Sequence, residues 1–204
     1  MKKSIILSLA IVIGTLSCAG NTDKEKTSAK EASVSEVVVN NIMARRSVRK
    51  YKDQTVSRDT LNRMLECGIK APNGMNQQNY DVKFVDDPAS ASFLAENVKG
   101  LYKAPVYIFI AAGDQYDLSQ IDCGLLSENI CLSATAYGLG SINLGGPVRS
   151  LRDNPGLLAK LGFGEHYKLC LVLALGYADE TPDAHPRRKE KVEFVKIPTA
   201  ASER

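Results

Sequence analysis

Residues 105–111 read PVYIFIA, a continuous apolar run that predicts a β-strand buried on both faces. A second run of the same kind, LCLVLALG, occupies residues 169–176. Strands without a polar face need other elements packed on both sides, because neither side is suited to water. The two runs therefore predict a small buried sheet at the centre of the domain.

Helical patterns fill most of the chain around these two runs. Val34, Val37, Val38 and Ile42 recur at the spacing of one helix face, and Ser57 is a suitable N-cap for the next helix. The combination predicts an α+β or α/β sandwich with a small central sheet. Helices are expected at residues 34–45, 58–71, 88–97, 117–137 and 148–161, the last interrupted at Pro155, with a further short strand at 82–85.

The first seventeen residues have the features of an export signal. Lys2 and Lys3 precede an apolar stretch at residues 5–16, which is too short to span a bilayer comfortably. Cys18 then follows small residues, as in a loose lipobox in which this cysteine is lipidated. The alternative is an ordinary secretory signal, residues 1–17, with a chance cysteine behind it.

Residues 18–35 carry little apolar surface and mixed charge, which is typical of a flexible tether. Residues 36–204 are long enough for one domain with a sizeable core. We therefore expect an exported protein whose lipidated cysteine anchors a folded domain to the cell envelope, with no other membrane contact.

Charge and cysteine spacing argue against two classes of function. The formal net charge of +3 falls to +1 once Lys2 and Lys3 are set aside, which gives no indication of nucleic-acid binding. Cys67, Cys123, Cys131 and Cys170 follow no metal-binding spacing, and we expect no metal site.

The sequence contains two clusters of basic residues. Residues 45–49, RRSVR, crowd three guanidiniums around one hydroxyl at the end of the first expected helix, and residues 187–189 read RRK. Arginine binds phosphate bidentately, and a neighbouring hydroxyl can complete the shell. The alternative for each cluster is solvated surface, because the sequence does not show that the two meet.

Two loops rich in amides or glycine are candidates for ligand contact. Residues 72–80 hold five amides, which suit the polar edge of a planar ring, although an ordinary turn explains them as well. Residues 138–146 form an expected glycine loop that fails the dinucleotide fingerprint, since Asn143 occupies the third glycine position. A helix C-cap followed by a turn is the alternative there.

These motifs, in this order, resemble those of the FMN-dependent nitroreductase family. They are Arg-x-Ser-x-Arg at 45–49, Ala-Pro-x-x-x-Asn-x-Gln-x-aromatic at 71–80, and Gly-Leu-Gly-Ser at 138–141 before a Gly-Gly turn. The resemblance covers the chain from Val34 onward. It implies a dimeric three-layer α/β/α sandwich with a small, mostly antiparallel sheet.

The resemblance also implies roles for individual residues. Arg45 and Ser47 would hold the FMN phosphate together with Arg187 or Arg188, Arg49 would lie beside the flavin pyrimidine, and Arg46 is expected to face elsewhere. The full set of implied cofactor contacts is Arg45, Ser47, Arg49, Pro72, Asn73, Asn76, Gln78, Asn97, Leu144, Gly145, Gly146, Arg187 and Arg188.

Six of these positions belong to other parts of the implied flavin site. Asn76 and Gln78 would reach the flavin of the other subunit, and Asn97 would lie near the polar edge of the ring. The backbone of residues 144–146 would face flavin N5 and O4. Gly145 replaces an acidic residue common in one subgroup, a departure that bears on substrate range and donor preference.

By the same resemblance, the expected activity is hydride transfer from NADH or NADPH through flavin N5 to a nitroaromatic, quinone or similar small-molecule oxidant. The flavin carries the chemistry, and the protein positions it without a catalytic side chain of its own. Two alternatives remain. One is another flavin reaction on this scaffold, reductive dehalogenation or flavin fragmentation, and the other is a non-catalytic surface lipoprotein that binds a ligand.

Overall fold

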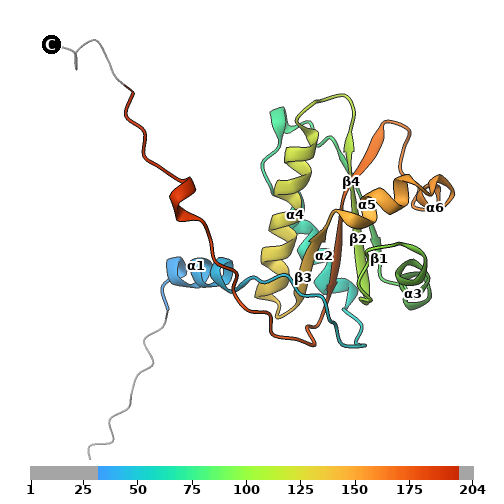
Figure 1. Ribbon diagram of the computed structural model, residues 1–204, viewed down its shortest axis with the longest axis horizontal. Helices are drawn as coiled ribbons and strands as arrows, with labels where there is room; N and C mark the ends of the chain where they lie inside the picture. Colours follow the sequence, from blue (N-terminus) through green and yellow to red (C-terminus); the bar gives the residue numbers. More distant parts are fainter. Residues whose placement is uncertain (1–31, 198–204) are drawn as a thin grey trace, which may run out of the picture. The chain divides into compact units, whose positions relative to one another are not determined.

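Antiparallel strands form one sheet in the order β1-β2-β4-β3 (Figure 1). The protein is described from a computed structural model, in which residues 32–197 are placed. The two apolar runs of the sequence are the central strands β2 and β4, as predicted, and all of β2 is buried. The strands are β1 Tyr80–Val85, β2 Val106–Gly113, β3 Gly140–Leu144 and β4 Tyr167–Gly176.

Helices lie where the sequence predicted them. The expected helix at 148–161 is two short helices, because Pro155 lacks a backbone N–H and begins a new helix. None of the helices within residues 32–197 has the length and apolar character needed to cross a membrane. The helices are α1 Val34–Ala44, α2 Arg58–Ile69, α3 Pro88–Asn97, α4 Ser119–Ala136, α5 Gly146–Arg152 and α6 Pro155–Ala159, with 3-10 turns η1 Gly74–Asn76 and η2 Lys189–Lys191.

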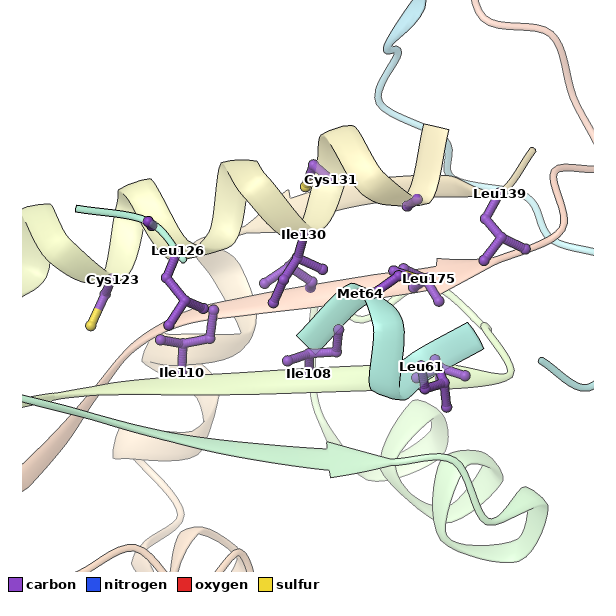
Figure 2. Packing of buried hydrophobic residues seen from close by; sticks show 14 of the residues in the cluster. Leu61, Met64, Ile108, Ile110, Cys123, Leu126, Ile130, Cys131, Leu139 and Leu175 are labelled. Atoms are coloured by element: carbon purple, nitrogen blue, oxygen red, sulfur yellow. The ribbon is translucent and has the colours of Figure 1, made fainter. Parts of the chain in front are cut away.

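The sheet lies between two helical layers, which confirms the expected α/β/α sandwich (Figure 1). Helices α2 and α4 cover one face, where Met64 and Ile130 pack toward Ile108 of β2 (Figure 2). Helices α3, α5 and α6 cover the other face around Phe109 and Val172. Alternate residues of β2 and β4 therefore contribute to two separate cores.

The prediction of a glycine loop at residues 138–146 is wrong for its middle residues, which form a strand. Gly138, with φ +72°, ends α4 as a glycine C-cap does. The chain then forms β3, whose residues pair with β4 from Gly140↔Gly176 to Leu144↔Val172. A strand is more favourable than a loop here because β4 offers an open hydrogen-bonding edge and because the strand buries Ile142 and Leu144.

The basic segment at residues 45–49 lies along the outer edge of β3. Val48 donates its N–H to the carbonyl oxygen of Ser141 at 3.1 Å. The side chain of Val48 packs on Gly140, where an added Cβ would lie only 2.7–2.9 Å from three Val48 carbons. Gly140 therefore serves close approach between two chain segments, with an ordinary strand conformation.

Tyr51 fastens the end of the same segment to the sheet. Its hydroxyl lies 2.6 Å from the carbonyl oxygen of Val48 and 3.1 Å from that of Ala174 in β4. Burial raises the pKa of Tyr51, so the phenol stays protonated and remains a donor. The backbone between Ser47 and Tyr51 is thus fixed at both ends.

We predict that Gly140→Ala destabilises the domain by about 1–3 kcal/mol, the usual cost of overpacking a filled site. Urea denaturation would measure the loss, and adding Val48→Ala should recover part of it because the Cβ then has room. Gly124→Ala is the matched control. Its Cβ would meet no atom within 4 Å among residues 32–197, and replacing a helical glycine should gain about 0.5–1 kcal/mol. Equal stability of Gly140→Ala and the wild type would contradict the packing argument.

Candidate functional site

A pocket of about 360 Å³ opens where the end of α1 meets the C-terminal segment. We call it the basic pocket. It brings together Arg45, Ser47 and Arg187, which lie far apart in the sequence and which the sequence predicted to act together. The lining residues are Ile42, Met43, Arg45, Arg46, Ser47, Glu128, Pro182, Asp183, Ala184, His185 and Arg187.

Arg45 is held between α1 and α4. Its Nε lies 3.4 Å from Oε1 of Glu128, and the two side chains are 23% and 47% exposed. One turn earlier, Nδ2 of Asn41 donates to the carbonyl oxygen of Leu132 at 2.9 Å, which ties α1 to α4. An ion pair this exposed is worth at most about 1 kcal/mol, so Glu128 orients Arg45 without preventing it from binding an anion.

The neighbours of Arg45 separate into different roles. Ser47 lies on the edge of β3, bridged to Ser141, and lines the pocket. Arg46 was expected to face elsewhere, yet it also lines the pocket. The reason is that its Nη1 folds back to the carbonyl oxygens of Met43 at 2.6 Å and its own neighbour Arg45 at 2.9 Å, where it caps the C-terminal end of α1.

Arg49 does not line the basic pocket. Its Nη1 donates to the carbonyl oxygen of Ser47 at 3.2 Å, and its side chain is exposed. The backbone N–H groups of Arg49 and Lys50 both donate to Oε1 of Glu180. This carboxylate fixes the backbone of the segment after Ser47, two residues from the pocket-lining Ser47.

Three lining residues carry polar groups that the sequence motifs did not single out. Glu128 comes from the middle of α4, while Asp183 and His185 come from the stretch before Arg187. Arg188, the alternative to Arg187, is not among the lining residues. The helical position of Glu128 gives no signal in the sequence, because only the packing of α1 on α4 brings it to Arg45.

The amide-rich segment at residues 72–80, the amide loop, is a structured turn. It contacts α4 at a different place from the basic pocket. Oδ1 of Asn73 accepts from the N–H of Gln78 at 2.9 Å, and the N–H of Gly74 lies 3.2 and 3.3 Å from the two oxygens of buried Asp122. Asn76 and Gln78 have φ of 53° and 50°, in the left-handed region, and their side chains are exposed. Pro72, which precedes the turn, is exposed as well.

Within one subunit the amide loop and the basic pocket are separate. Asp122 and Glu128 are six residues apart on α4, which corresponds to about 9 Å along the helix axis. The exposed amides of Asn76 and Gln78 therefore remain available to another molecule. Their predicted contact with a flavin of another subunit stays a prediction.

The remaining predicted contacts lie on the opposite helical layer. Leu144 ends β3 and is buried, while Gly145 and Gly146 are exposed at the start of α5. Asn97 ends α3, and its Nδ2 donates to the carbonyl oxygen of Phe93 at 2.8 Å. None of the four residues lines the basic pocket.

A polar cluster joins β3 to α4. The buried hydroxyl of Ser141 has no hydrogen-bond partner among residues 32–197. Asn143 accepts from Ser127 Oγ at 2.6 Å and donates to Cys131 Sγ at 3.7 Å. Burial raises the pKa of Cys131, so this thiol stays neutral. No group of three metal-ligating side chains occurs in the described part of the chain.

Comparison with known proteins identifies the family. A family model described as "Putative TM nitroreductase" matches residues 37–203. The chain belongs to this nitroreductase family. A relative from Archaeoglobus fulgidus, named "Putative NADH dehydrogenase/NAD(P)H nitroreductase", is 30% identical over 150 residues, which cover 70% of this chain and 86% of the relative.

Solved structures agree with the sequence match. A nitroreductase with bound FMN from Bacteroides fragilis has a TM-score of 0.70 and 25% identity, covering 78% of this chain and 98% of the other. A second nitroreductase with bound FMN, from Desulfitobacterium hafniense, has a TM-score of 0.67 and 26% identity with the same coverage.

The residues of this nitroreductase fit the phosphate of a flavin mononucleotide. Arg45 and Arg187 offer N–H forks, and Ser47 offers a hydroxyl, on one solvent-open pocket. A planar fork matches two phosphate oxygens at once, which a lysine cannot do. The basic pocket is therefore the candidate phosphate site of the cofactor.

Proposed function

We propose that this nitroreductase binds FMN and transfers hydride from NADH or NADPH to a nitroaromatic, a quinone or a similar acceptor. The observation that carries the proposal is the convergence of Arg45, Ser47 and Arg187 on one pocket. The names of the relatives support it, since they include an NAD(P)H nitroreductase and nitroreductases with bound FMN.

In this proposal the protein binds and orients the cofactor. When bound, FMN supplies hydride acceptance and donation at its N5 atom. Arg45 and Arg187 neutralise the phosphate charge, and Ser47 donates a hydrogen bond to a phosphate oxygen. Arg49 lies two residues beyond Ser47, and its backbone N–H donates to the carboxylate of Glu180. From this position its guanidinium supplies positive charge beside the ring.

The test separates recognition of the phosphate from recognition of the ring. We expect the wild type to bind FMN more tightly than riboflavin, which lacks the phosphate. Arg45→Ala should weaken FMN binding by about 10- to 100-fold, as expected for the loss of one charge-assisted contact of about 1.5–3 kcal/mol, and should leave riboflavin binding nearly unchanged. Flavin fluorescence quenching measures both affinities.

Arg63→Ala is the matched control for this experiment. Arg63 is an exposed arginine on α2 that pairs with Glu66 at 3.2 Å and does not line the basic pocket. Its removal should change neither affinity. A wild-type protein that binds neither flavin, or an Arg45→Ala variant with unchanged FMN affinity, would remove the basis of the proposal.

We also propose that the protein is a homodimer. No residue of α1 is buried, and apolar side chains lie on its surface. Val37 is 56% exposed and Val38 is 53% exposed. At the start of α4, the N-cap residue Leu118 and the helical residues Ile121 and Leu125 form a further exposed stripe at helical spacing. Apolar surface of this extent is typical of an interface, and a second copy would also bring the amide loop to a flavin site.

Ile121→Asp on the α4 stripe should convert the dimer to a monomer, since a buried unpaired carboxylate is strongly unfavourable. Light scattering during size-exclusion chromatography would measure the mass. Phe93→Asp is the control, because Phe93 is 44% exposed on α3 in the other helical layer. A wild-type protein that elutes as a monomer at micromolar concentration would exclude the dimer.

We propose, finally, that Cys18 carries a lipid that anchors the domain to the cell envelope. Residues 1–17 and Cys18 lie outside the described residues, and the proposal rests on the sequence pattern alone. Cys18→Ala should move the protein from the membrane fraction to the soluble fraction after cell lysis. Unchanged fractionation of this variant would reject the lipid anchor, whereas Cys67→Ala, which removes an exposed cysteine of α2, should fractionate like the wild type.

A further inference from the structure

A β-bulge in β4 directs the side chain of Cys170 to the face of the sheet opposite the one that strict alternation predicts. The β2–β4 register shifts between Ile110, which pairs with Leu171, and Ala111, which pairs with Leu169, so Cys170 is the extra residue. Strict alternation would direct Cys170 to the core around Phe109, because Val172 and Ala174 face that side. Instead Cys170 and Leu171 both pack on the α4 side. Bulges re-aim side chains in this way and often mark functional positions.

The re-aimed thiol meets a second cysteine. Cys123, on the inner face of α4, is fully buried, and Figure 2 shows its sulfur pointing from the helix toward the strands. Its Sγ lies 3.7 Å from the carbonyl oxygen of Ala111, while Sγ of Cys170 lies 3.4 Å from that of Ile110. The two thiols thus contact the carbonyl oxygens of adjacent residues of β2, close enough for each to shift the pKa of the other.

Access and charge differ between the two thiols. Cys170 lines a pocket of about 280 Å³, whose charged lining residues are Arg152, Lys168, Asp114 and Asp117, whereas Cys123 does not line it. The Nη2 atom of Arg152 lies 3.4 Å from the carbonyl oxygen of Leu169, next to Cys170 in the chain. The neighbouring thiol of Cys123, followed by backbone hydrogen bonding at Ala112 and Cys170 and then by Arg152, lowers the pKa of Cys170. The neighbouring thiol of Cys170, followed by burial, raises the pKa of Cys123.

We propose that Cys170 is a thiol-reactive site for low-molecular-weight disulfides and that Cys123 resolves the product into an intramolecular disulfide. This property is independent of FMN binding and goes beyond the proposed reductase activity. A half-buried thiol that lines a pocket beside a fully buried second thiol is the arrangement that thiol–disulfide exchange requires.

The exchange proceeds in two displacements. The Cys170 thiolate attacks one sulfur of a disulfide R–S–S–R, so that the R–S–S–R bond breaks, a Cys170–S–S–R bond forms, and one thiolate leaves. Cys123 then attacks the Cys170 sulfur and releases the second R–S group. The two protons of the cysteine thiols pass to the two leaving thiolates, and the protein is oxidised by two electrons while the disulfide reagent is reduced by two.

Capping Cys170 prepares Cys123 for the second displacement. The neighbouring Cys170 thiol is the largest cause of the raised pKa of Cys123, and a Cys170 sulfur held in a mixed disulfide carries no charge. Cys131 offers no competing route, because it lies further along α4 beside Ser141 and Asn143. Cys67 is exposed on α2 and has no cysteine partner among residues 32–197.

The experiment treats the folded, reduced full-length chain with bis(2-hydroxyethyl) disulfide, blocks remaining thiols with N-ethylmaleimide, and maps peptides by mass spectrometry without reduction. A peptide pair joined through Cys123 and Cys170 is the expected product. Cys123→Ser should trap the reagent on Cys170 as a stable mixed disulfide, and Cys170→Ser should leave Cys123 unmodified. Cys131→Ser, the matched buried-cysteine control, should give the same cross-link as the wild type.

Two outcomes would overturn the proposal. One is modification of Cys67 alone, with both Cys123 and Cys170 recovered as free thiols. The other is a cross-link that appears only when the chain is first unfolded in urea, where any pair can meet. Because the folded wild type and the Cys123→Ser variant report on different steps, loss of folding in one variant does not leave the question open.

Discussion

The contact between Val48 and Gly140 is the constraint on which the candidate site depends. A side chain at residue 140 would occupy the space of Val48, so the basic segment can lie against β3 only because residue 140 has no Cβ. The hydrogen bond from the Val48 N–H to Ser141 then sets the register, and Tyr51 fixes the far end. Every position from Ser47 to Tyr51 follows from this one close approach.

Helix α4 organises the rest of the molecule. Near its start, Asp122 holds the amide loop through the N–H of Gly74, and one residue later Cys123 faces the re-aimed thiol of β4. About one and a half turns further on, Glu128 orients Arg45. A single helix thus positions the phosphate pocket, the amide loop and the cysteine pair, since these side chains leave it on different faces. The outer stripe of α4 remains for a second subunit in the proposed dimer.

Local sequence patterns predicted the elements well, because those patterns reflect local physics. Continuous apolar runs gave β2 and β4, and Ser57 caps α2 by accepting from the N–H of Thr60, as predicted. The error at residues 138–146 has the same origin. Glycine-rich sequence favours a loop when it is considered alone, but β4 supplied hydrogen-bond partners that the local sequence does not reveal. The direction of the Arg46 side chain was predicted wrongly because its guanidinium donates to carbonyl oxygens at the end of the preceding helix.

The sequence by itself determined the two buried strands, the helices around them, the family and the residue types that suit a phosphate. Those properties depend on composition, periodicity and motif order, which are local. Only the tertiary structure decided that Arg187 joins Arg45 and Ser47, that Glu128 orients the site, and that Cys170 faces Cys123. Each of these depends on how separate segments pack, and a single inserted residue in β4 reverses the direction of a side chain without leaving a recognisable pattern in the sequence.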